Sequence, residues 1–215
     1  MNKDSLINEL KQKHPLEVYV DRAITESTRL PILLEIIETD KTALKFFCEK
    51  IIHQVSQRQP GLLYPYFERM AALTHNENNF IKWGFIQSLP NLLVVDQAHK
   101  WPKVNQHFLA LLDSPSVVTY GSAVAGIPKI VRQYPQYEPE YVSKLLKVDQ
   151  HTFLYKGEVS PECQNVSKAH IIDCFTQMYP DSKFKQQILS FVQANRENPR
   201  KQVRQKAARF LKNHS

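Results

Sequence analysis

The sequence predicts an all-α protein built from about five repeated αα-hairpins. Apolar residues recur at helical spacing (i, i+3, i+4, i+7) along nearly the whole chain, and no segment sustains the alternation of a strand. Glycine supplies only 5 of 215 residues, which disfavours most β-folds and glycine-rich dinucleotide loops. Four helical windows open with a proline at intervals of 34, 37 and 37 residues: Pro31, Pro65, Pro102 and Pro139.

These prolines mark the first helix of each hairpin, because proline is tolerated in a first helical turn, where its missing N–H costs nothing. An apolar stretch follows each proline, at 33–37, 67–73, 108–112 and 141–146. Turn residues that can cap the next helix follow the first three stretches, as in 113–116.

The second helices share a small residue near their middle, which lets a neighbouring helix come close. Gly84, Gly121, Ala169 and Ala207 occupy this position, and Phe47 fills it in the first hairpin. We therefore draw repeat units at 27–58, 60–96, 99–135, 137–179 and 181–213, the fourth being about 11 residues longer than the others. Residues 1–26 are expected to form N-terminal capping helices, and 27–215 the repeat array, as one domain overall.

From residue 27 to residue 213 the chain resembles the HEAT/armadillo-like α-solenoid family. The best-matching stretches are 78–84 (NNFIKWG) and 203–211 (VRQKAARFL). The resemblance implies a right-handed α-solenoid in which the second helices line a concave surface.

Charge and cysteine usage limit the partners and the compartment. The net charge is +7, of which residues 196–215 carry +6, so the rest of the chain is close to neutral. A basic end permits contact with nucleic acid but does not make a basic groove. Cys48, Cys163 and Cys174 are too irregular for a disulfide framework. With no signal peptide and no apolar run long enough to span a membrane, we expect a cytoplasmic protein that does not bind membranes.

The sharpest pattern is an aromatic ladder: Phe46, Trp83 and Tyr120 lie 37 residues apart, each one residue before the repeated position of its helix. Lysines flank the series or occupy the same place in later units: Lys45, Lys82, Lys168 and Lys206. If these residues face a groove, aromatic rings with interleaved cations suit an extended peptide or stacked bases. The alternative is that the rings pack against the next repeat.

Two further features have both a functional and an ordinary interpretation. The extra segment 147–161 of the fourth unit is either a binding loop or a tolerated surface insertion. His170 and Cys174, with Cys163 nearby, have the spacing of metal ligands but lack a fourth partner. We therefore expect no metal and no cofactor.

No known catalytic motif is present, so the first hypothesis is a non-enzymatic scaffold that binds a protein or peptide on its concave face. The alternative is a nucleic-acid-binding protein related to the HEAT-like DNA-alkylation-repair glycosylases. Trp83 and Tyr120 would then supply the aromatic contacts, although no Asp or Glu is identified beside Trp83. The phosphate contacts would be Lys45, Lys82, Lys168, Lys206 and Arg204.

Overall fold

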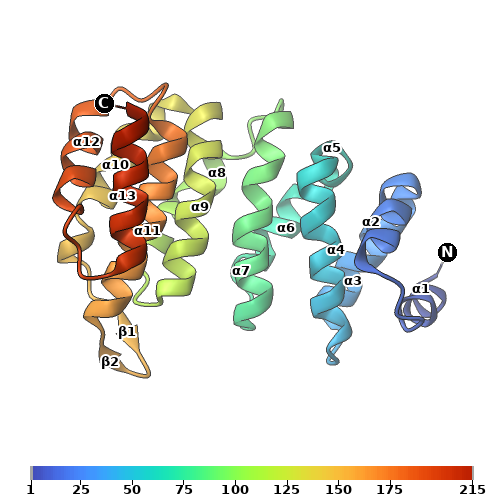
Figure 1. Cartoon of the computed structure of the whole chain (residues 1–215). Helices are drawn as coiled ribbons and strands as arrows, with labels where there is room; N and C mark the ends of the chain where they lie inside the picture. Colours follow the sequence, from blue (N-terminus) through green and yellow to red (C-terminus); the bar gives the residue numbers. More distant parts are fainter. Residues whose placement is uncertain (1, 215) are drawn as a thin grey trace. The chain divides into compact units, whose positions relative to one another are not determined.

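The computed structural model describes residues 2–214. It consists of helical hairpins that form two compact units, Met1–Val104 and Asn105–Ser215 (Figure 1). Each unit is described by itself below. Within residues 2–214, no helix is both long enough and apolar enough to cross a membrane.

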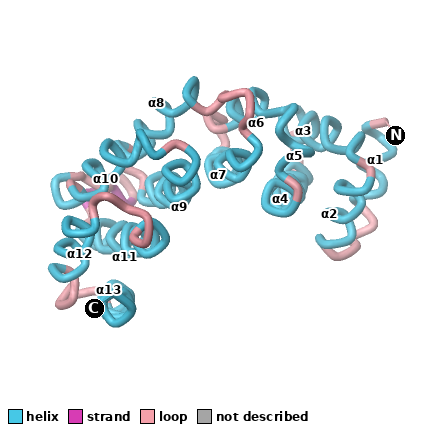
Figure 2. The backbone as a smooth tube through the Cα atoms, turned by 90° about the horizontal axis from the view of Figure 1, so that it is seen from above, coloured by secondary structure: helices cyan, strands magenta, loops and turns pink. Residues whose placement is uncertain are grey.

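The first unit has two layers of helices. One layer contains α2, α4 and α7, and the other contains α1, α3 and α6 (Figure 2). The helices are α1 (Lys3–Leu10), α2 (Leu16–Thr25), α3 (Leu30–Thr39), α4 (Leu44–Arg58), α5 (Pro60–Leu63), α6 (Phe67–Leu73) and α7 (Asn79–Ser88). Three short 3₁₀ segments connect them, at Ser27–Arg29, Tyr64–Tyr66 and Leu89–Val95. The pairs α3/α4 and α6/α7 are the first two predicted hairpins.

Local sequence sets the helix boundaries in this unit. Pro31 lies in the first turn of α3, as its restricted backbone predicts. Asn78 caps α7 because its side chain accepts the backbone N–H groups of Phe80 and Ile81. The cap fixes where α7 begins and therefore which of its residues face α4.

Charged groups link the two N-terminal helices to the start of the first hairpin. The Glu9 carboxylate of α1 accepts hydrogen bonds from Arg22 of α2 (2.7 Å) and from Arg29 (2.8 Å). The Arg29 side chain is only 8% exposed and also pairs with Glu26. Burial alone would raise the pKa of Glu9, but the hydrogen bonds from Arg29 and Arg22 outweigh it and hold that pKa below its usual value.

The second unit contains three hairpins. Its helices are the end of α8 (Pro102–Ala110), then α9 (Val117–Gln133), α10 (Glu138–Leu146), α11 (Pro161–Met178), α12 (Lys185–Ala194) and α13 (Lys201–His214). Short 3₁₀ segments lie at Leu111–Asp113, Pro135–Tyr137 and Val148–Gln150. Helices α9, α11 and α13 lie side by side (Figure 2), so α8/α9, α10/α11 and α12/α13 complete the five hairpins of the described residues.

The extra segment of the fourth hairpin folds into a small β-hairpin, an element that the sequence analysis did not predict. Strand β1 (Leu154–Tyr155) pairs antiparallel with β2 (Glu158–Val159). The turn between them has positive φ at Lys156 (52°) and Gly157 (86°), as a two-residue hairpin turn requires. The segment is too short to show the alternation that identifies a strand in sequence.

The repeated small residues lie at close approaches between second helices. Ala169 and Ala207 are 2% and 0% exposed. At the two glycines, the neighbour that comes close is a side chain: a Cβ at Gly84 would lie 2.0 Å from Glu49 Oε1, and one at Gly121 would lie 3.0 Å from the His170 ring. Each missing side chain thus leaves space for a polar group of the adjacent helix.

We predict that Ala207→Leu destabilises the second unit by about 1–3 kcal/mol, because the added methyl groups would overpack the contact between α13 and α11. Ala208→Leu is the matched control, since Ala208 is exposed on the same helix; its effect should stay within about 0.5 kcal/mol. Urea unfolding followed by circular dichroism measures both variants. If Ala207→Leu and wild type unfold at the same urea concentration, position 207 has no packing constraint.

We also predict that Glu9→Gln lowers the free energy of unfolding at pH 7 by about 1–3 kcal/mol, because Arg29 loses a charged partner in a largely buried position. The pKa of Glu9 is lower in the folded than in the unfolded state. Its stabilisation is therefore complete above the unfolded pKa and disappears as the pH falls through the lower, folded pKa. The difference between wild type and variant should vanish at that acidic end.

Urea unfolding at a series of pH values tests this second prediction. Glu77→Gln is the control, since it removes the same charge from an exposed position. A destabilisation by Glu9→Gln that stays constant with pH would contradict an ionic role for Glu9.

Candidate functional site

Three aromatic rings form a continuous cluster on α4 and α7 of the first unit. Phe46 contacts Phe80 edge-on, with ring centroids 5.9 Å apart, and Phe80 contacts Trp83 in the same manner at 5.5 Å. Phe46 and Trp83 are half-buried, whereas Phe80 is 68% exposed. We call these three residues the aromatic cluster.

Phe80 is the member that the sequence analysis missed. It lies three residues before Trp83 and therefore on the same face of α7. It lies outside the 37-residue register of Phe46 and Trp83 and so does not belong to the predicted ladder. Its position next to the helix cap Asn78 was the available signal, since a residue in the first turn of a helix is often accessible.

Lysines border the aromatic cluster. Lys45 Nζ lies 5.3 Å from the centre of the Phe46 ring, within the range of a cation–π contact. Lys82, on α7, is half-buried. Neither lysine lines the groove beside the cluster, and their role as binding residues stays a prediction.

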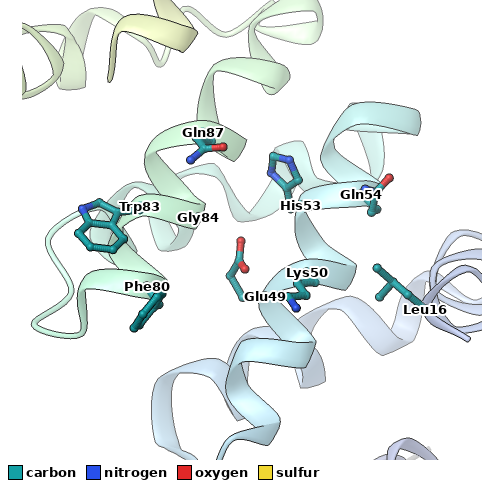
Figure 3. Close-up of a pocket in the computed structure, with 9 residues that line it drawn as sticks. All are labelled: Leu16, Glu49, Lys50, His53, Gln54, Phe80, Trp83, Gly84 and Gln87. Carbon is teal, nitrogen blue, oxygen red and sulfur yellow. The ribbon is translucent and has the colours of Figure 1, made fainter. Parts of the chain in front are cut away.

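A groove of about 380 Å³ adjoins the cluster between α4 and α7. Phe80, Trp83 and Gly84 line it from α7, and Glu49 and His53 line it from α4, as Figure 3 shows. The residues that complete the lining are Leu16, Lys50, Gln54 and Gln87. The groove therefore combines exposed aromatic surface with a carboxylate.

Glu49 is the most unusual group in the groove. Its carboxylate extends from α4 towards α7 (Figure 3) and fills the space that the missing side chain of Gly84 leaves. Burial raises the pKa of Glu49 to about 7, and the nearby charge of Lys50 opposes that rise only in part. Among residues 2–214, nothing forms a hydrogen bond or ion pair with this carboxylate. Sequence analysis found no acid beside Trp83; in the structure Glu49, from α4, lies against the next residue of α7, Gly84.

Hydrogen bonds fix the side chain of His53, which lines the groove from α4. Ser88 Oγ donates to the carbonyl oxygen of Gly84 (2.8 Å), so it accepts from Nδ1–H of His53, also at 2.8 Å. Nε2 of His53 then accepts from the Gln57 side-chain amide at 3.0 Å. These hydrogen bonds hold the His53 ring in place on the α4 side of the groove.

Tyr120, the third member of the predicted ladder, is buried and offers no ring to a partner. It is 2% exposed and packs against Phe153, with ring centroids 5.1 Å apart, and against His151 at 5.7 Å. Both partners belong to the extra segment 147–161. This insertion, which the sequence analysis considered as a possible binding loop, covers Tyr120.

Three of the predicted cations interact within the second unit. Lys168 pairs with Asp149 at 2.6 Å, and Lys206 pairs with Asp173. Arg204 donates to the backbone carbonyl oxygens of Asn198 and Pro199, both at 2.8 Å. These three charged groups therefore have partners within the second unit.

The residues considered as metal ligands take part in packing. His170 lies against Gly121, and Cys174 Sγ is 3.5 Å from Met178 Sδ. Burial raises the pKa of the Cys174 thiol, which disfavours the thiolate that a metal needs. No group of three or more His, Cys, Asp or Glu residues in the described part of the chain could hold a metal ion.

Comparisons with known proteins bear on the fold. No family model and no curated protein matches the sequence. Among solved structures, the chain is similar to a designed armadillo repeat protein, YIII(Dq)4CqI, with a TM-score of 0.58 and 15% sequence identity over 90% of this chain and 84% of that chain. The predicted fold class is thereby confirmed: the protein has an all-α solenoid fold of the armadillo/HEAT-like type.

Proposed function

We propose that the protein is a non-enzymatic scaffold whose first unit binds an extended segment of a partner protein. The aromatic cluster and the adjoining groove form the binding surface. Both lie on α4 and α7, second helices of their hairpins, which the family resemblance assigns to the concave side of such arrays.

The observation that carries this proposal is the exposed edge of the aromatic cluster. Phe80 is 68% exposed although its ring touches two other aromatic rings. Aromatic residues that gather at an accessible surface beside a groove are typical centres of protein interfaces. Lys45 and Lys82 at the border would provide the polar rim that surrounds such a centre.

Nucleic acid is the less supported partner. The first unit contains 13 basic and 12 acidic residues, so no excess of positive charge surrounds its aromatic cluster. Lys168, Lys206 and Arg204, three of the five proposed phosphate contacts, are engaged within the second unit. Tyr120 is not available to stack on a base.

Selection of peptides from a displayed random library, with the whole protein as bait, tests the proposal. We predict that selected peptides lose affinity by about tenfold or more on Trp83→Ala or Phe80→Ala, as expected for residues at the centre of an interface. Fluorescence anisotropy of a labelled peptide measures the dissociation constant.

Val94→Ala is the matched control, because Val94 is an apolar residue of the same unit, 72% exposed and outside the groove. It should leave the affinity unchanged. If no peptide is enriched, or if enriched peptides bind Trp83→Ala and wild type equally, the proposed binding surface is wrong.

A further inference from the structure

A carboxylate of the second unit is buried with little compensation from the protein. Glu138, in the first turn of α10, is only 4% exposed. Its Oε2 accepts a hydrogen bond from the backbone N–H of Lys183 at 3.4 Å, which is longer than a usual N–H···O bond. Its Oε1 is buried and has no hydrogen-bond partner among residues 2–214. Burying a charged oxygen without a partner is costly, so a donor supplied by a ligand would stabilise it.

Glu138 lines a cavity of about 200 Å³ between the end of α9 and the end of α11. This space exceeds the volume of about 10–15 Å³ that a single water molecule needs. It is smaller than the roughly 300–1,000 Å³ of most small-molecule pockets, so its ligand must be small. Part of the wall is apolar and consists of Pro128, Val131, Pro135 and Met178.

The charges of the four ionisable residues in the lining sum to zero. Glu138 and Asp181 carry the negative charges, and Arg132 and Lys183 carry the positive ones. Arg132 and Lys183 are exposed, and neither forms an ion pair in the described part of the chain. A simple cation or a simple anion would leave charges of one sign unanswered, whereas a ligand with both charges answers both.

The free oxygen of Glu138 favours an ammonium group over a guanidinium group. A guanidinium group binds a carboxylate best through both oxygens at once, and Oε2 of Glu138 already faces the Lys183 N–H. An ammonium group is a compact charge that can donate to a single oxygen. The N-terminus of α10, where Glu138 lies, favours the ionised carboxylate that this contact needs.

We propose that this cavity binds a free α-amino acid with an apolar side chain. The ammonium group of the ligand would donate to Oε1 of Glu138, and its carboxylate would bind the exposed Arg132 and Lys183. Its side chain would pack against Pro128 and Met178. The site belongs to a different unit from the aromatic cluster and does not depend on the proposed peptide binding.

The test titrates the whole protein, labelled with carbon-13 in its methionine methyl groups, with L-leucine. Met178 lines the cavity, whereas Met70 is buried in the first unit and serves as an internal control. We expect leucine to shift the Met178 NMR signal saturably and to leave the Met70 signal unchanged. If leucine does not shift the Met178 signal at any concentration up to its solubility, the proposal is overturned.

Two analogues that each lack one charge test the need for a zwitterion. Isopentylamine has the ammonium group and the apolar chain of leucine without the carboxylate, and isocaproate has the carboxylate without the ammonium group. Each should bind about tenfold or more weakly than leucine, because a charged hydrogen-bonded contact is lost. If either analogue binds as tightly as leucine, the assignment to an amino acid is wrong.

Paired variants assign the two charged contacts. Glu138→Gln keeps the size of the side chain and should weaken leucine binding by about tenfold or more, whereas Glu140→Gln removes an exposed acid of the same helix and should not. Arg132→Gln should weaken the binding of leucine but not that of isopentylamine, and Arg196→Gln, which removes an exposed cation outside the cavity, should weaken neither.

Circular dichroism checks that each variant folds. Should Glu138→Gln unfold, the comparison of Arg132→Gln with Arg196→Gln still decides, because both positions are exposed. If folded Glu138→Gln or Arg132→Gln binds leucine as wild type does, the proposal is wrong.

Discussion

Close packing between second helices of neighbouring hairpins is the constraint on which the rest of the structure depends. A helical hairpin cannot bury its apolar face alone, so it is stable only when the next hairpin covers that face. In the second unit Ala169 and Ala207 are buried at the repeated small position. At positions 169 and 207 a larger residue would overpack this contact.

At two of these positions, glycine lets a polar side chain of the adjacent helix enter the contact. In the first unit the incoming group is Glu49 and the result is a carboxylate within a groove. In the second unit it is His170, whose pKa is lowered by burial and by the charge of Lys206. One packing rule thus produces two chemically different environments.

The fold was predictable from the sequence because the same helix signals recur in each repeat. Prolines such as Pro31 and Pro139 mark first helices, and the small residues mark second helices. A helix that is unclear in one repeat can therefore be assigned from the same position in the others. The candidate site was predictable only in part. Phe46 and Trp83 follow the repeat register, whereas Phe80 and Glu49 do not, and their proximity depends on how α4 lies against α7. Tyr120 follows the register but is covered by residues distant in sequence.

The segment that covers Tyr120 shows how such an array can change its surface without changing its helices. Phe153 and His151 reach the tyrosine from an insertion that begins and ends within one hairpin. Helices α9 and α11 pack side by side, as the second helices of the other hairpins do. The insertion therefore covers the tyrosine without altering that packing. Lengthening or shortening such a loop would cover or expose a ring that the helices already carry.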